Sequence, residues 1–508
     1  MAFLFDWEEG KTIYTQKTAE ASISGELFQL PAGPLGIAVG VTARRDAIED
    51  TPGEITLAGN AWGNTASGIT AGKSVTTEAF GELSIPVLAD VPFFRELTLS
   101  AAGRLTNVKA TRKSDGVSDK DDGNFTYKLG ANWAVTDWLR FRGTYGTSFR
   151  APALFEQFKA NETSFIAQGR IDPCSSWAAG LAAGTTSQRV ADNCAADGIP
   201  GNYAAGGVSA TVFSQGGLGL LDSETSKAWV VGGILTPKFD FLGDSQFSLA
   251  VDYFNIEVNK EITQLGAATI LFGCYDSENF ASEPLCNQFT RGQNATAIYQ
   301  VANVFDQYIN IASQKQEGID VSANLRTDFG KWGRLSLSAD MTWSLNDDFQ
   351  LLPTSPVTSN NGEAGSPKWV GDFRATWAFD GGFSLFYGVN VIGKTSDQAD
   401  FEDRNGGPCL NSFNRQDTAS TADDLPIYGT YCPDLTTPMT FYHNASITQE
   451  IADGRFEITA GVSNIFNTRP PRVSVLNGGQ ISMLGPVVAA SQYPFTGRRG
   501  FINVTAKF

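Results

Sequence analysis

Apolar and polar residues alternate along much of this 508-residue chain. Residues 334–343 give the clearest example, where Leu335, Leu337 and Ala339 alternate with arginine and serine. Residues 319–326, 124–133 and 139–150 follow the same pattern. Successive side chains of a β-strand point to opposite faces, so this period of two predicts strands with one apolar and one polar face.

The alternation predicts fifteen strands and an all-β chain. Beyond the runs above, it recurs near residues 19–30, 33–45, 74–88, 95–108, 226–237, 245–258, 367–379, 383–393, 440–450, 455–465 and 500–508. The run at 226–237 is the weakest, because Trp229 and Val231 blur the alternation. No segment keeps a helical period over three turns.

The connections between these strands alternate between short and long. Short turns are expected at 31–32, 89–94, 137–138, 240–243, 329–332, 381–382 and 451–454; long loops are expected at about 51–73, 109–122, 151–223, 263–311, 352–365, 400–438 and 468–496. A transmembrane barrel has tight periplasmic turns at one rim and long extracellular loops at the other. A soluble sandwich or propeller, the alternative, has no reason to place every long loop at one end. We therefore predict a transmembrane antiparallel up-and-down β-barrel.

Composition narrows the choice of protein class. Charged residues make up 18% of the chain, against about 25% in soluble proteins, and 35 Phe, 13 Tyr and 10 Trp argue against disorder. The longest apolar run, from Ala228 to Leu235, is too short for a membrane-spanning helix of about 20 residues. The net charge of −17 argues against a nucleic-acid partner. A single histidine leaves little room for histidine-based catalysis.

Aromatic residues gather at the expected short-turn rim. Trp138 and Trp332 lie at short turns, and the residues near strand ends on the same rim are Trp133, Trp377, Phe379, Phe383 and Phe508. Such rings favour the depth of lipid headgroups. We expect them to mark a membrane surface, with ordinary core packing as the alternative for any single ring.

The six cysteines lie in three of the expected long loops, two in each loop: Cys174, Cys194, Cys274, Cys286, Cys409 and Cys432. Six cysteines allow 15 connectivities, but this distribution favours the local pairs 174–194, 274–286 and 409–432. Disulfides indicate an oxidising compartment. Cysteine metal sites are disfavoured, because no Cys-x-x-Cys pair occurs.

Other polar groups suggest weaker site hypotheses. Acidic clusters in the loops could hold Ca²⁺, although a solvated face is the more common role of such residues: Asp115, Asp119, Asp121, Asp122, Asp397, Asp400, Glu402 and Asp403. No other cofactor is expected. His443 lies in an apolar column with Phe441, Ala445 and Ile447, which favours a position at the membrane interface over metal ligation.

The polar residues of the strands should line the inside of the barrel, as a hydrated wall: Lys128, Asn132, Arg140, Arg142, Asp252, Asp320, Arg326, Asp340, Asp372, Arg374 and Asn390. Aromatic residues of surface loops do much of the ligand contact in receptors. Phe155, Phe158, Phe165 and Trp177 in the longest loop are therefore candidate ligand contacts.

The last strand ends in an aromatic residue. Its apolar positions are Ile502, Val504, Ala506 and Phe508, next to Phe501. A terminal Phe on an amphipathic strand is what outer-membrane proteins present to the barrel-assembly machinery, so this strand is a candidate assembly signal.

Two segments resemble the TonB-dependent outer-membrane receptor family. They are Gly143–Phe158, which reads GTYGTSFRAPALFEQF, and Gly461–Pro471, which reads GVSNIFNTRPP and precedes a final Gly-Arg-Arg strand. The segments Leu27–Arg45 and Ala79–Leu83 are similar to mid-barrel sequence of the same family. Within the first segment, Arg150, Pro152 and Glu156 should be structural, because they end a strand and open a loop.

The resemblance implies an energised importer in the cell outer membrane. Members take up iron chelates, cobalamin, and sometimes carbohydrates or other metals through a 22-stranded barrel with an N-terminal plug. A TonB box engages the inner-membrane energy-transducing complex. The expected partners are membrane lipid, a small-molecule substrate such as a metal chelate, the barrel-assembly machinery and, through the missing N-terminal part, the TonB complex.

The sequence departs from the family at its N-terminus. Residues 1–9 show no signal peptide, and neither a plug nor a TonB box is recognisable. Bacterial barrels normally have an even number of strands, so fifteen strands suggest the last part of a 22-stranded parent. We therefore expect residues 1–508 to form a single partial barrel, truncated at the N-terminus. A passive outer-membrane pore or a surface-binding barrel is the alternative function; a barrel enzyme is disfavoured, because His443 lies in the lipid-facing column.

Overall fold

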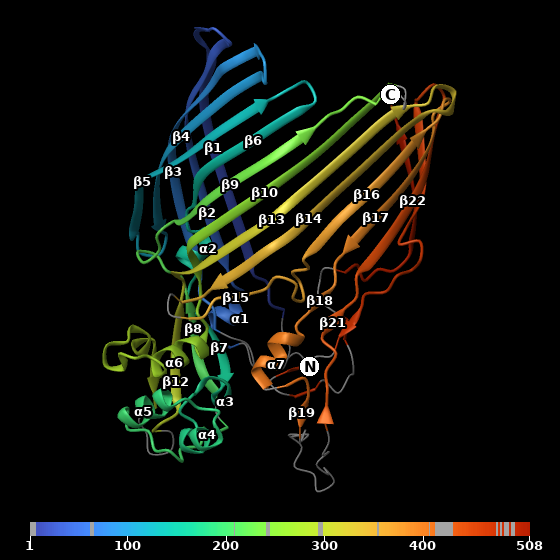
Figure 1. Ribbon diagram of the computed structural model, residues 1–508. Coiled ribbons are helices and arrows are strands. Elements are labelled where there is room, and N and C mark those ends of the chain that lie inside the picture. Colours follow the sequence, from blue (N-terminus) through green and yellow to red (C-terminus); the bar gives the residue numbers. More distant parts are fainter. Residues whose placement is uncertain are drawn as a thin grey trace.

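The structure is a computed structural model. It describes residues 7–60, 66–207, 209–239, 244–292, 298–352, 355–405, 407–411, 430–473, 476–477, 480–481, 487–488 and 493–507. Phe508, part of the expected assembly signal, lies outside the described residues. Figure 1 shows one large curved sheet with folded loops gathered at one end.

Fifteen antiparallel strands follow one another in a single sheet, here called the barrel sheet. They are β1 (Lys11–Leu30), β2 (Gly33–Thr51), β3 (Thr70–Val91), β4 (Phe94–Arg112), β5 (Ser118–Ala134), β6 (Leu139–Arg150), β9 (Glu224–Leu235), β10 (Asp244–Thr263), β13 (Ile309–Asp328), β14 (Arg334–Gln350), β16 (Trp369–Ala378), β17 (Phe383–Ile392), β22 (Thr440–Ile451), β23 (Phe456–Ser463) and β28 (Arg499–Ala506). The short β15 (Thr358–Ser359) adds to β14. The fifteen strands and the antiparallel architecture expected from the sequence are confirmed.

The register gives the barrel sheet one apolar and one polar face. On the apolar face, one cross-strand row joins Phe247, Leu325, Leu337, Ala375 and Tyr387. On the polar face, another row joins Asn132, Arg142, Gly232, Asp252, Asp320 and Thr342. A slip of one residue would exchange the faces, so the alternation in the sequence fixes this register.

The two ends of the barrel sheet differ. At the short-turn end, the turn between β16 and β17 contains Gly381 and Gly382, both with positive φ, which glycine adopts at little cost. At the opposite, long-loop end, connections reach the length of residues 151–223. One prediction was wrong here: only residues 113–117 separate β4 from β5, where a loop over 109–122 was expected. Both strands continue into polar sequence, and the pairing between them extends as far as Thr111 opposite Ser118.

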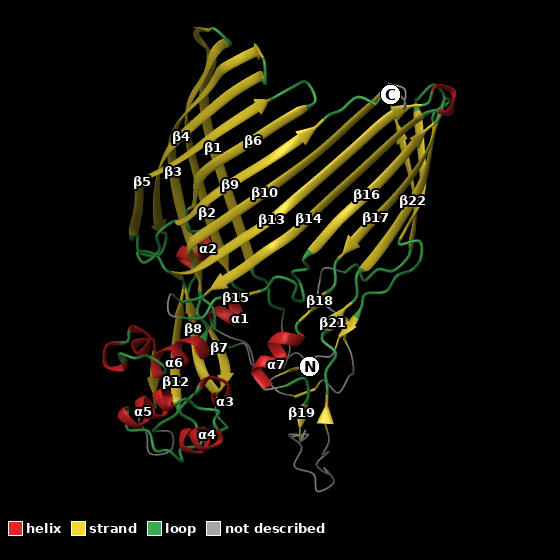
Figure 2. Cartoon of the chain, in the orientation of Figure 1, coloured by secondary structure: helices red, strands yellow, loops and turns green. Residues whose placement is uncertain are grey.

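Two long connections fold together into a loop subdomain, comprising the described residues of 151–223 and 264–308. It contains a four-stranded sheet in the order β11 (Phe289–Arg291), β12 (Val301–Gln307), β8 (Ser209–Gln215) and β7 (Glu162–Ala167). Around it lie α3 (Gln168–Ile171), α4 (Trp177–Ala183), α5 (Gln188–Ala196), α6 (Ala267–Tyr275), η2 (Phe280–Ser282) and η3 (Pro284–Gln288), while α2 (Leu154–Phe158) lies against the rim of the barrel sheet. Figure 2 shows most helices of the chain at the long-loop end.

The remaining elements are short. They are α1 (Glu54–Leu57), η4 (Gly330–Trp332), α7 (Gln398–Asn405), and the two-residue strands β18 (Thr395–Ser396), β19 (Leu410–Asn411), β20 (Thr430–Tyr431), β21 (Thr436–Thr437), β24 (Arg472–Val473), β25 (Leu476–Asn477), β26 (Gln480–Ile481) and β27 (Val487–Val488). Among the described residues, no helix has the length and apolarity to cross a membrane.

The barrel sheet ends in two exposed strands. β1 and β28 stand at the two ends of the strand order, and each is hydrogen-bonded to one neighbour, β2 and β23. Every residue of β28 is exposed, as is every residue of β1 except Leu30. Both faces of the inner strands are better covered, so the exposure marks these two strands as the edges of the sheet.

Candidate functional site

The polar face of the barrel sheet carries a ladder of charged pairs. Arg142 donates from Nε to Asp252 Oδ1 at 2.7 Å, across the intervening strand β9. Gly232 of β9 lies between them, and a Cβ there would come within 2.1 Å of the Asp252 carboxylate. Arg140 likewise pairs with Glu96 at 3.1 Å. Many of the polar residues expected to line the barrel therefore bond to neighbouring side chains on the same face.

A groove of about 650 Å³ crosses the polar face at the short-turn end. Its lining includes Gln246, Asn324, Arg326 and Arg374. Arg374 is paired with Asp372 at 2.5 Å, whereas Arg326 has no ion-pair partner within the described ranges. Lys238, also in the lining, likewise has no ion-pair partner in the described part of the chain, so the groove offers two uncommitted cations among hydroxyl and amide groups.

At the long-loop end, Arg150 ties the barrel sheet to the loop subdomain. Its Nε donates to Glu224 Oε2 at 2.7 Å, and its two Nη atoms donate to the Glu156 carboxylate, each at 3.0 Å. Glu156 also accepts from the Ala153 backbone N–H at 2.7 Å, at the start of α2. Glu224 accepts from Ile262 N at 2.8 Å. This geometry supports the structural role expected for Arg150 and Glu156.

The loop subdomain has a dry core drawn from both connections. Ile171, Val212, Ile270, Leu271 and Val304 are buried in one cluster. Strands β8 and β12 pair in parallel, from Asn303 opposite Thr211 to Gln307 opposite Gln215. Apolar burial contributes about 25 cal/mol per Å², so this core holds the two loops in one arrangement.

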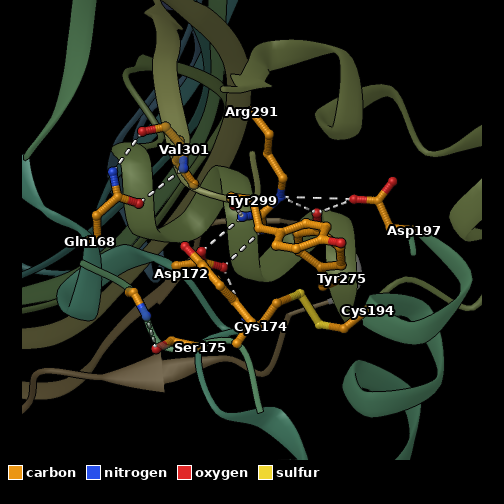
Figure 3. A network of polar contacts seen from close by, with 12 residues as sticks. Gln168, Asp172, Cys174, Ser175, Cys194, Asp197, Tyr275, Arg291, Tyr299 and Val301 are labelled. Carbon is orange, nitrogen blue, oxygen red and sulfur yellow. Dashed lines mark hydrogen bonds and ion pairs between the residues drawn. A yellow bond between two sulfur atoms is a disulfide. The ribbon is translucent and has the colours of Figure 1, made fainter. Parts of the chain in front are cut away.

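A polar network fixes the far half of the loop subdomain (Figure 3). Arg291 donates from Nη1 and Nη2 to the two carboxylate oxygens of Asp172, both at 2.8 Å. Its Nε donates to Tyr275 Oη at 2.9 Å, and that hydroxyl donates to Asp197 at 2.6 Å. Burial alone would lower the pKa of Arg291, but the bonds to Asp172 and its charge raise it, so the guanidinium stays charged.

Two other groups complete this network. The Gln168 side-chain amide donates to Val301 O at 2.6 Å and accepts from Val301 N at 3.0 Å. It thus bonds to the backbone of Val301 as the backbone of a neighbouring β-strand would. Burial, aided by the charge of Asp172, raises the pKa of Tyr203 to about 12. Elsewhere in the subdomain, burial raises the pKa of Asp306 above its ordinary value.

The three disulfides join the cysteines in the local pairs favoured by the sequence: Cys174–Cys194, Cys274–Cys286 and Cys409–Cys432. The first two lie in the loop subdomain. Cys174, Cys194 and Cys274 are buried together with Tyr275, so the sulfur bridges form part of its core.

The four candidate loop aromatics do not form one site. Phe158 is 2% exposed and packs against Leu154 and Ala110. Its ligand role is therefore corrected: α2 docks on the rim of the barrel sheet through this ring. Trp177 is half-buried against the Cys174–Cys194 core and donates from Nε1 to Ile199 O at 3.0 Å. Phe155 and Phe165 remain exposed.

Several carboxylates of the acidic clusters form local bonds. Asp115 pairs with Arg112 at 2.7 Å, which lowers the pKa of Asp115. Asp121 accepts from Asn124 at 2.8 Å, and Asp397 accepts from Ala364 N at 2.7 Å. In the described part of the chain, no three His, Cys, Asp or Glu side chains gather as a metal site. The side chain of Asp403 lies outside the described residues. Calcium binding stays a prediction.

His443 and the last strand lie where the alternation puts them. His443 Nδ1 is 2.6 Å from Tyr387 Oη, and Ala445 of the same column stands opposite Tyr387 on the apolar face. Ile502, Val504 and Ala506 of β28 share that face. Phe501 stands opposite Gly461, where a Cβ would collide with its ring.

The comparisons with known proteins agree with this architecture. The family model described as TonB dependent receptor-like, beta-barrel matches residues 7–465. A search of curated proteins finds no match.

Among solved structures, the chain is similar to the pyoverdine outer membrane receptor FpvA from Pseudomonas aeruginosa PAO1 bound to pyoverdine. The identity is 12% and the TM-score 0.51, over 99% of this chain and 54% of that one. It is also similar to the FpvAI–pyocin S2 complex, with 11% identity and a TM-score of 0.51, over 98% of this chain and 50% of that one. This chain thus spans about half the length of these structures. At such identities the likeness concerns the fold alone. The family match covers most of the sequence, and the chain belongs to the TonB-dependent receptors, a family of outer-membrane β-barrels.

Proposed function

We propose that this chain is the barrel portion of an outer-membrane importer of a scarce nutrient, such as an iron–siderophore complex, cobalamin or a carbohydrate. One observation carries the proposal: a loop subdomain with a shared apolar core and a disulfide within each of its two connections stands at the long-loop end of a wall with one polar face. A receptor needs a preorganised surface, because ordering flexible loops on binding costs affinity.

Family membership and exposed or unpaired side chains support a proposal for the substrate class. One solved structure of similar fold is described as an outer membrane receptor bound to pyoverdine. Phe155 and Phe165 are exposed in the loop subdomain, and Arg326 is an unpaired cation in the polar-face groove. Aromatic and cationic groups suit an anionic metal chelate, which makes such a chelate the preferred candidate.

Energised import requires parts beyond the fifteen strands. We propose that further strands complete the barrel between β1 and β28, and that a plug reached by the TonB complex occupies its lumen. The exposed edges support this, since each unpaired backbone group in lipid costs several kcal/mol. The apolar positions of β28 support a role for that strand in recognition by the barrel-assembly machinery.

Uptake by cells tests the proposal. The longest reading frame that contains this chain is expressed in a strain without its own receptors, and the uptake of labelled ferric siderophores, cobalamin and oligosaccharides is measured. We expect uptake of one class, lost when the proton gradient or TonB is removed. Uptake that persists without TonB would indicate the alternative, a passive pore. Surface binding of cells or proteins without uptake would indicate an adhesion barrel.

A further inference from the structure

The apolar face of the barrel sheet carries a row of positive charges near its long-loop end. Lys17 stands directly opposite Arg45, Arg45 opposite Val75, Val75 opposite Lys109, and Lys109 opposite Lys120. We call these four cations on β1–β5 the cationic row. All four side chains are exposed. Lys73 lies one row further toward the loops, also exposed.

Nothing in the described structure neutralises this row. Lys17, Arg45, Lys109 and Lys120 form no ion pair with a described carboxylate, and Asp122, two residues from Lys120, does not pair with it. Nearby, Glu49 is already bonded to Lys113 at 2.7 Å. Like charges directly opposite one another on a sheet are unfavourable, so Lys17 with Arg45 and Lys109 with Lys120 destabilise the isolated sheet.

The next strands show that this arrangement is not a general property of the rim. Lys227 stands opposite Glu257, Glu257 opposite Lys315, and Lys315 opposite Asp348. These residues form the corresponding row on β9–β14, and their charges alternate in sign. On β9–β14 the charges of the rim therefore balance one another, whereas on β1–β5 the positive charges are left unbalanced.

The cationic row lies at the border of the lipid-facing band. Ala19 follows Lys17 by two residues and Ala43 precedes Arg45 by two, and Leu105 and Phe125 begin the apolar positions of β4 and β5. Two residues span about 7 Å along a strand, a distance that places the charges at headgroup depth. A groove of about 460 Å³ opens beside the row and is lined by Arg45, Lys73, Thr111 and Lys113, with Glu49.

We infer that the cationic row and this groove bind the phosphate groups of anionic membrane lipid in the leaflet at the long-loop end. Phosphate oxygens accept bonds from lysine and arginine, and they would remove the repulsion between the paired cations. The side chains point along the apolar face rather than into the barrel, so a dissolved nutrient in the lumen does not meet them. The inference rests on the barrel lying in a membrane and is independent of which nutrient it imports.

Lipid titration tests the inference. The full chain, purified in a neutral detergent, is titrated by calorimetry with mixed micelles that contain the bisphosphorylated glycolipid lipid A. We expect Arg45→Gln, Lys109→Gln and Lys120→Gln each to weaken binding by about fivefold, since each basic residue near an anionic lipid surface contributes on that scale. The control variants Lys227→Gln and Lys315→Gln, from the balanced row, should bind as the unchanged chain does. Lys109→Arg keeps the charge and should restore binding.

Three further results separate the sources of phosphate. Phosphatidylcholine micelles should bind equally to every variant, and inorganic phosphate should not compete with lipid A. Competition by inorganic phosphate at equal phosphorus concentration would overturn the lipid assignment in favour of a small anion. Equal weakening by the two control variants would show a diffuse charge effect and would also overturn the inference. Far-ultraviolet circular dichroism of each variant confirms that the barrel sheet is folded, and uptake assays remain a separate readout of the proposed function.

Discussion

Arg291 and Asp172, 119 residues apart in the chain, meet in a two-bonded ion pair inside the loop subdomain. The Asp172 side chain is fully buried and that of Arg291 is 11% exposed. Each comes from a different barrel connection, so the pair locks the connection between β6 and β9 to the one between β10 and β13. A receptor surface built from two loops depends on such a lock to keep one shape.

Removing one partner of this pair should unfold part of the loop subdomain. We expect Arg291→Met to reduce its free energy of unfolding by about 3–5 kcal/mol, because the buried Asp172 charge loses its partner. Hydrogen exchange of residues 168–175, 289–292 and 298–304, followed by mass spectrometry, measures the loss. Arg189→Met is the control: Arg189 pairs with Asp276 and Glu278 while remaining 45% exposed, and such pairs are worth about 0–1 kcal/mol. Equal protection in both variants would contradict the lock.

The Cys174–Cys194 bridge should stabilise the loop subdomain without affecting the barrel sheet. It closes a segment with a sequence separation of 20, and restricting a loop of that size contributes about 3 kcal/mol. The double substitution Cys174→Ser, Cys194→Ser should expose the subdomain to limited proteolysis while the sheet stays resistant. Cys409→Ser with Cys432→Ser is the matched control, because that bridge lies in another connection. Cleavage that spread into the barrel strands would show that the subdomain and sheet unfold together.

The buried Asp306 predicts an acid-dependent contribution to stability. Burial raises its pKa in the folded chain, against the bonds from the Gly266 and Leu265 backbone and the charge of Lys159. An acid with a raised folded pKa contributes stability that is complete below its unfolded pKa of about 3.9, and that is lost as the pH rises through the folded value. Asp306→Asn should therefore stabilise the subdomain at neutral pH and differ little from the unchanged chain near pH 4. Thermal unfolding of both chains across this range is the measurement. A constant difference at every pH would contradict the assignment.

The sequence predicts the barrel sheet well, because lipid on one side and a polar interior on the other impose a strict alternation. The strands nevertheless extend beyond the expected limits. β1 begins at Lys11 rather than near residue 19. Its pairing with β2 continues into a segment where neither face is apolar, so the alternation that marks a strand in the sequence is lost there. The cysteine pairs were predictable because each bridge is local within one connection.

The loop subdomain could not be predicted from local pattern. The nine-residue helices α5 and α6 are too short to be stable alone, and they are held by contacts between connections distant in sequence. One such contact is the bond from Asn193 to Tyr275 O at 2.8 Å. The same reason explains the error at Phe158, whose burial depends on the docking of α2 against β3 and β4. Within the candidate site, the sequence identified the longest loop and the Arg150 signature, but it gave no sign of the Arg291–Asp172 network.

Substitutions of two phenylalanines in one loop should distinguish a residue needed for folding from a residue that contacts the ligand. Phe158→Ala removes a ring from a buried cluster and should reduce the free energy of unfolding by about 3–5 kcal/mol. Phe165, on β7, is 63% exposed, so Phe165→Ala should leave stability within about 0.5 kcal/mol. If Phe165 contacts the nutrient, its replacement should weaken binding of the imported ligand while hydrogen exchange stays unchanged. Fluorescence titration of both variants with that ligand decides the matter: unchanged affinity in Phe165→Ala would remove this ring from the binding surface.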